Sequence, residues 1–170
     1  MPEFVRTINL GNARITIINI GDIYLPLAGC MNLSESELVT LSDLQELANQ
    51  KHIPIQFIHI WLPKTSVLVD AGVYDIPPDS EYAIPGYEPP PGLLDRLVEL
   101  EIHPSKIEHV IITHRHWDHF NGTTIEENGQ YAPCFPNARY YLGRADWRNG
   151  ERHWMIPSQL ITARLEYYTG

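Results

Sequence analysis

The sequence predicts an α/β protein in which helices cover one β-sheet. Three observations lead to this fold class. Apolar, β-branched runs separated by turn residues fill much of the first 72 residues, and leucines at helical spacing follow them. A continuous apolar strand then precedes a cluster of histidines. With 44% hydrophobic and 19% charged residues and no internal repeat, the chain is expected to form a single domain over residues 1–170.

The N-terminal third is expected to be mostly strand. "VRTINLGNARITIINIGDI" predicts a hairpin that turns at Gly11-Asn12. "IQFIHIWLP" and "TSVLVDAG" predict a second strand pair joined near Pro63-Lys64. Between the two pairs, residues 24–33 are expected to be loop, and a capping pair in "SDLQELANQ" predicts a helix over residues 42–51.

The rest of the chain alternates helix and strand. The Pro-rich stretch 76–92 predicts a long loop of the kind that is often functional. "GLLDRLVELEI" predicts an amphipathic helix, "KIEHVIITH" a buried strand, "ARYYLG" a further strand and "RADW" a helical segment that carries Asp146. "SQLITARLEYY" predicts a closing helix that begins at Ser158.

Charge and composition narrow the expected partners. Twelve basic residues against 21 acidic ones give a net charge of -9, which argues against a nucleic acid or an anionic membrane surface as partner. The two cysteines lie far apart in no metal spacing, which favours a reducing compartment. We find neither an N-terminal apolar signal region nor an apolar run long enough for a membrane span, so a cytoplasmic protein is expected.

The stretch "ITHRHWDHFNG" carries the chemistry, because it places His114, His116, Asp118 and His119 within six positions. In an extended segment His114, His116 and Asp118 would point to one side and His119 elsewhere. This spacing predicts two pairs, His114 with His116 around one metal and Asp118 with His119 around a second. The following "FNGTT" can form the N-terminus of a helix.

Imidazole and carboxylate ligands suit Zn²⁺, and also Fe or Mn. A metal with an open position lowers the pKa of bound water to about 7 and so supplies hydroxide at neutral pH. The isolated histidines are interpreted as ordinary surface or core residues; they are His52, His59, His103 and His153. Trp117 is expected either in the core or, with the Pro-rich loop, at the pocket.

"THRHWDHFNG" resembles the H-x-H-x-D-H-x-x-G signature of the metallo-β-lactamase-fold hydrolases. "VLVDAG", with Asp70 and Gly72, resembles that superfamily's first motif, and the two occur in the superfamily's order. "FPNARYYLGRADW" is similar to the segment that follows in lactonase-like and organophosphate-hydrolase-like members. The resemblance covers about residues 14 to 150, which is most of the chain. It is a resemblance to the N-terminal half of such enzymes.

This resemblance implies an αββα sandwich that hydrolyses an ester, lactone, thioester or phosphoester with one or two metal ions, zinc first among them. It carries His114 and His116 over as ligands of one metal, and Asp118 and His119 as ligands of the other, with Asp118 also taking part in catalysis. Asp70 would order the loop that bears these ligands. A turn-forming role for Asp70 is the alternative.

The superfamily pattern requires a further histidine, a bridging aspartate and a last histidine, and His153 is the single histidine after His119. Three interpretations stay open. The chain is the N-terminal half of a longer enzyme, incomplete at its C-terminus. Or it is a small variant that uses His153, water or a partner chain. Or it is a non-catalytic metal-binding or interaction domain. A chain that lacks the second half is expected to self-associate or to need a complementing chain.

Overall fold

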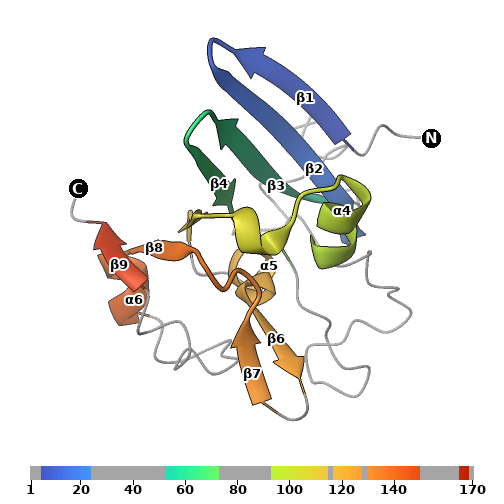
Figure 1. Ribbon diagram of the computed structural model, residues 1–170. Coiled ribbons are helices and arrows are strands. Elements are labelled where there is room, and N and C mark those ends of the chain that lie inside the picture. Colours follow the sequence, from blue (N-terminus) through green and yellow to red (C-terminus); the bar gives the residue numbers. More distant parts are fainter. Residues whose placement is uncertain are drawn as a thin grey trace, which may run out of the picture.

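A computed structural model describes residues 5–23, 53–72, 93–114, 117–127, 130–149 and 165–168. Its main feature is a seven-stranded mixed sheet in the order β1-β2-β3-β4-β5-β8-β9 (Figure 1). The sheet strands are β1 (Val5–Leu10), β2 (Ala13–Ile23), β3 (Ile53–Leu62), β4 (Thr65–Val69), β5 (His109–Ile112), β8 (Arg139–Gly143) and β9 (Leu165–Tyr168). The remaining elements are α4 (Leu93–Glu99), η1 (Pro104–Lys106), α5 (Trp117–Phe120), η2 (Asn121–Thr123), β6 (Thr124–Glu127), β7 (Gln130–Pro133) and α6 (Arg144–Asn149).

The first four strands form the two hairpins that the sequence predicts. β1 and β2 pair antiparallel across a turn at Gly11-Asn12, where Gly11 has φ 58°. β3 and β4 pair antiparallel across Pro63-Lys64. The two hairpins are joined by antiparallel pairing of β2 with β3, which confirms a sheet built from the alternating β-branched runs.

The last strands change the sheet from antiparallel to parallel. β4 pairs parallel with β5, and β5 pairs parallel with β8. The crossover from β4 to β5 includes the predicted helix α4, and the crossover from β5 to β8 includes α5, η2 and the separate β6–β7 hairpin. Parallel strands end at the same edge of a sheet, so the residues after β4 and after β5 lie next to each other.

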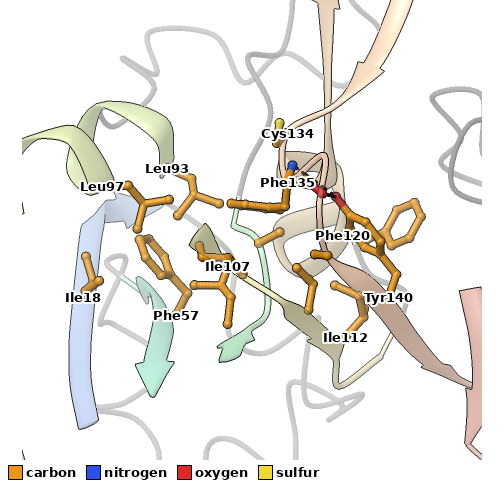
Figure 2. Packing of buried hydrophobic residues seen from close by; sticks show 14 of the residues in the cluster. Ile18, Phe57, Leu93, Leu97, Ile107, Ile112, Phe120, Cys134, Phe135 and Tyr140 are labelled. Carbon is orange, nitrogen blue, oxygen red and sulfur yellow. Dashed lines mark hydrogen bonds between the residues drawn. The ribbon is translucent and has the colours of Figure 1, made fainter. Parts of the chain in front are cut away.

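One face of the sheet packs on the helices to form the core. Leu93 and Leu97 of α4 are buried against this face, near Ile18 and Phe57 (Figure 2). Toward β8, the hydroxyl of buried Tyr140 accepts from the backbone N–H of Phe135 at 3.2 Å and donates to its carbonyl at 3.3 Å. These two bonds satisfy the phenol inside the core, which a buried hydroxyl requires.

The other face of the sheet is also apolar, and within the described residues it stays partly exposed. Ile15 pairs with Ile60, and Val69 pairs with Ile111, so the strand alternation places these four side chains away from the core. Ile111 is 41% exposed, although β5 is an interior strand of the sheet. We call this surface, made up of Ile15, Ile60, Val69 and Ile111 with their same-side neighbours, the open face.

Two predictions about local structure are wrong. Residues 165–168 of the predicted closing helix form β9, which pairs parallel with β8, because the free edge of β8 offers backbone hydrogen bonds that outweigh helical propensity. "FNGTT" does not begin an α-helix: α5 ends at Phe120, the short 3₁₀ helix η2 spans Asn121–Thr123, and β6 starts at Thr124. Three other predicted segments lie outside the described residues: the loop at 24–33, the helix at 42–51 and the Pro-rich loop at 76–92.

Candidate metal centre

Asp70 lies directly after β4, at the sheet edge where β5 also ends. Its backbone N–H donates to the carbonyl of Ile111 at 2.8 Å, which holds the two strand ends together. Its φ of 62° is in the left-handed region, which aspartate tolerates better than most residues. The carboxylate is largely buried, and it accepts from the backbone N–H of Thr113 at 2.8 Å. Asp70 therefore ties the end of β4 to the start of the histidine segment.

The same carboxylate holds His119. Asp70 Oδ2 lies 2.8 Å from Nδ1 of His119, which is on α5. A carboxylate only accepts, so Nδ1 carries the proton and Nε2 faces away from Asp70. On its other side, Nε2 of His119 lies 3.3 Å from Oδ2 of Asp118. His119 is thus placed between two carboxylates, one of which holds it and one of which is itself a predicted ligand.

The two carboxylates raise the pKa of His119 to about 9. The hydrogen bond with Asp118 contributes most, followed by that with Asp70, while partial burial acts in the opposite direction. At neutral pH and without a metal ion, His119 is therefore an imidazolium with a proton on each nitrogen.

His114 lies beside His119. Their ring centroids are 4.0 Å apart at an interplanar angle of 48°. This corrects the expectation that His119 faces elsewhere: α5 begins at Trp117, so Asp118 and His119 lie on a helical turn rather than in an extended segment. Asp118 contacts His119 at 3.3 Å, and His114, which follows the end of β5, lies beside the His119 ring.

Two glycines allow this close packing. A Cβ on Gly122 would lie 1.8 Å from the carbonyl oxygen of Ala71, so only glycine lets the segment after α5 approach the strand end. Gly72 has φ 66°, and a Cβ there would lie 2.9 Å from the Ile20 side chain. Backbone bonds join the two segments, from Ala71 N–H to the His119 carbonyl at 2.8 Å and from Gly122 N–H to the Gly72 carbonyl at 3.3 Å. Both glycines belong to the quoted motifs.

The residues of the described part supply an incomplete ligand set. Among residues 5–23, 53–72, 93–114, 117–127, 130–149 and 165–168, no three His, Cys, Asp or Glu side chains form a group that could hold a metal ion. His116, His153 and the Trp117 side chain lie outside the described residues. The described side chains of the cluster, His114, Asp118 and His119, are of the donor types that suit a divalent metal, although they do not form such a group.

Two other histidines differ in role. His59 is buried and its Nε2 bonds the Ser66 hydroxyl at 2.7 Å, and burial, aided by the Arg14 charge, lowers its pKa. This confirms its interpretation as a core residue. His109 is a residue that the sequence pattern alone does not mark. Its Nδ1 lies 3.0 Å from the Tyr141 hydroxyl, on the open face, and both line a groove of about 500 Å³ that reaches Thr113.

The comparisons with known proteins cover the same part of the chain. The family model described as "Metallo-beta-lactamase superfamily" matches residues 57–124, the part that contains both Asp70 and the histidine cluster. The sequence resemblance to this superfamily is therefore confirmed over that stretch. No curated protein matches the sequence significantly.

Solved structures extend the likeness to almost the whole chain. A dizinc quorum-quenching lactonase in complex with a product is 20% identical, with a TM-score of 0.70 over 97% of this chain and 61% of its own. A hydrolase of the β-lactamase superfamily is 16% identical, with a TM-score of 0.70 over 99% and 62%. An N-acyl homoserine lactone hydrolase with its product at the catalytic metal centre is 17% identical, with a TM-score of 0.57 over 98% and 60%.

These likenesses show the fold. The chain has the α/β architecture of metallo-β-lactamase-fold proteins, and it spans about three fifths of the length of these neighbours. This is consistent with the predicted N-terminal half of the sandwich. In the described part of the chain, no helix has the length and apolar character that crossing a membrane requires.

Proposed function

We propose that this chain carries the metal-binding half of a metal-dependent hydrolase. The observation that carries the proposal is the Asp70 carboxylate, which accepts from Thr113 at the end of β5 and from His119 on α5. One buried anion thus brings together the two ends of the H-x-H-x-D-H segment. Such support of ligating imidazoles from behind is what a metal site requires and what a turn-forming aspartate does not need.

His114 and His116 would hold one metal ion, and Asp118 and His119 a second, with Zn²⁺ as the expected metal and Fe or Mn as alternatives. The metal would supply Lewis-acid activation of water and of the substrate carbonyl or phosphoryl group. The protein's own part is to keep the imidazoles oriented. Asp118, which lies beside His119 and is partly exposed, would also be the proton-handling group of the site.

The substrate would be a small ester, lactone, thioester or phosphoester. Two of the structural neighbours are described as lactonases or lactone hydrolases, which favours the lactone class. The net charge of -9 argues against nucleic acid and anionic membrane surfaces as partners. We also propose that the protein is cytoplasmic. Self-association or a complementing chain would supply further ligands.

A non-catalytic metal-binding or interaction domain is the second candidate. The observation in its favour is that the donors among the described residues fall short of a three-ligand group, whereas a catalytic zinc usually has three protein ligands. An inactive fragment of a longer enzyme would likewise bind metal without turning over a substrate. Metal binding alone therefore does not separate the candidates, but turnover does.

The test is zinc-dependent turnover of a panel of lactones, carboxylic esters, thioesters and phosphoesters by the purified chain. We expect activity that chelation removes and zinc restores, and that is lost in Asp118→Asn. His103→Ala is the matched control, because His103 is exposed and lies on the connection between α4 and η1. Stoichiometric zinc binding without any turnover would favour the non-catalytic domain.

A further inference from the structure

The hydroxyl of Thr113 lies between Asp70 and His114. Its Oγ1 is 3.0 Å from Oδ1 and 2.9 Å from Oδ2 of Asp70, and it is 3.1 Å from Nδ1 of His114. Thr113 is the last residue before the histidine segment and follows β5 directly. The side chain therefore connects the buried carboxylate to the first histidine of the cluster.

Counting protons fixes the direction of each bond. A threonine hydroxyl has one proton to donate and two lone pairs with which to accept. The Asp70 carboxylate only accepts, so the hydroxyl proton goes to Asp70. The bond between Thr113 and His114 must then run the other way, with Nδ1–H of His114 as donor and Oγ1 as acceptor.

We propose that Thr113 is a positioning residue that holds His114 in the Nδ1–H tautomer, so that Nε2 is the nitrogen presented to a metal ion. Asp70 thereby sets the orientation of two imidazoles at once, His119 by direct contact and His114 through the Thr113 hydroxyl. The part of this inference that concerns a metal ion rests on the proposed function. The part that concerns the tautomer of His114 does not, because the tautomer is a property of the metal-free chain.

Removing the hydroxyl separates this role from a structural one. The backbone N–H of Thr113 donates to Asp70 Oδ1 at 2.8 Å whatever the side chain is, so the link between the strand ends remains in Thr113→Val. Valine has the same shape as threonine, but it can neither donate to Asp70 nor accept from His114. Thr113→Ser keeps both abilities and is the rescue variant.

The experiment is a long-range ¹H–¹⁵N correlation spectrum of the metal-free protein labelled at the histidine nitrogens, recorded above the raised pKa of His119. His114 is assigned by the loss of its signals in His114→Ala. We expect the Nδ1–H tautomer in the wild type and in Thr113→Ser. In Thr113→Val we expect a shift to the Nε2–H form, which free neutral imidazole side chains prefer. Thr16→Val is the control, since Thr16 is a buried threonine on β2.

Zinc affinity is the second readout. Loss of a group that orients a ligating histidine typically costs 10–100-fold, and because Thr113 is exposed we expect about 10-fold in Thr113→Val. An Nε2–H tautomer in the wild type, or an unchanged tautomer in Thr113→Val, would overturn the proposal. If the wild type bound no zinc, the proposed function would fail, while the metal-free spectra would still decide the role of Thr113.

Discussion

At the scale of single residues, the candidate site depends on one buried acid. Asp70 accepts hydrogen bonds from the backbone and the hydroxyl of Thr113 and from the ring of His119. Asp70 itself is not one of the predicted metal ligands. Its role is to accept hydrogen bonds from the segment that bears the predicted ligands and so to orient that segment.

Asp70→Ala is expected to lower zinc affinity 10–100-fold without removing a ligand, as is typical when the support of a ligating histidine is lost. Competition with a chromogenic chelator measures the affinity. Asp95→Ala, an exposed aspartate on α4, is the control that should leave it unchanged. Equal affinities in the two variants would leave Asp70 as a turn residue only.

The raised pKa of His119 predicts a pH dependence of stability in the metal-free chain. The folded-state pKa of about 9 lies above the ordinary value of 6.5, so the ion pairs of His119 stabilise the fold fully below pH 6.5. That contribution is lost as the pH rises through about 9. Melting curves in a chelator should therefore show the difference between wild type and His119→Ala shrinking over this range. A difference that grows with pH would contradict the sign.

At the scale of elements, the site is made where two parallel strands end and a short helix turns back onto them. β4 delivers Asp70, β5 delivers Thr113 and His114, and α5 delivers Asp118 and His119. The contact between Gly122 and Ala71 fixes the distance between the strand end and the segment that follows α5. The geometry of the site thus depends on backbone packing as much as on the ligands.

Gly122→Ala is expected to destabilise the protein by about 3 kcal/mol, because the added Cβ would meet the carbonyl of Ala71 and overpacking costs typically 1–3 kcal/mol. Chemical denaturation measures the free energy of unfolding, and zinc affinity should fall with it. Gly143→Ala is the control, since its Cβ would meet only the Asp146 side chain, at 3.3 Å. A loss in Gly122→Ala no larger than the small loss expected for Gly143→Ala would mean that the segment after α5 adjusts freely.

The sequence predicts those helices and strands whose pattern of apolar residues lies within a single segment. The two hairpins, α4, β5 and β8 follow from alternation and helical spacing within each segment. β9 does not follow from the local pattern, because "LEYY" is compatible with a helix or a strand. Its pairing with β8 determines that it forms a strand. Likewise, residue spacing indicates the candidate metal-site residues but not the turn at Trp117 that brings His119 to His114. His109 is marked only by its contact with Tyr141 on a neighbouring strand.

At the scale of the whole molecule, the open face is the unusual feature. A sheet that is apolar on both faces normally has both faces covered. Here α4 covers one, while Ile8, Leu10 and Ile111 of the other are 43%, 69% and 41% exposed. The structural neighbours are longer than this chain, which spans about three fifths of their length. We propose that this chain, when isolated, self-associates through the open face.

Ile111→Asn should reduce that association, because it replaces an exposed apolar side chain at the centre of the open face. Size-exclusion chromatography with light scattering measures the mass. Val98→Asn is the control: Val98 is 70% exposed but lies on α4, so its substitution should leave the mass unchanged. A wild type that is monomeric at every accessible concentration would contradict this prediction.

The central claim is that the H-x-H-x-D-H segment and Asp70 form a metal site, and the most direct test is the zinc content of the purified chain. After loading and removal of free metal, we expect one or two bound zinc ions in the wild type and in His103→Ala. In His116→Ala we expect tight binding to be lost while the circular dichroism spectrum stays the same. Unchanged zinc content in His116→Ala, or no bound zinc in the wild type, would contradict the claim.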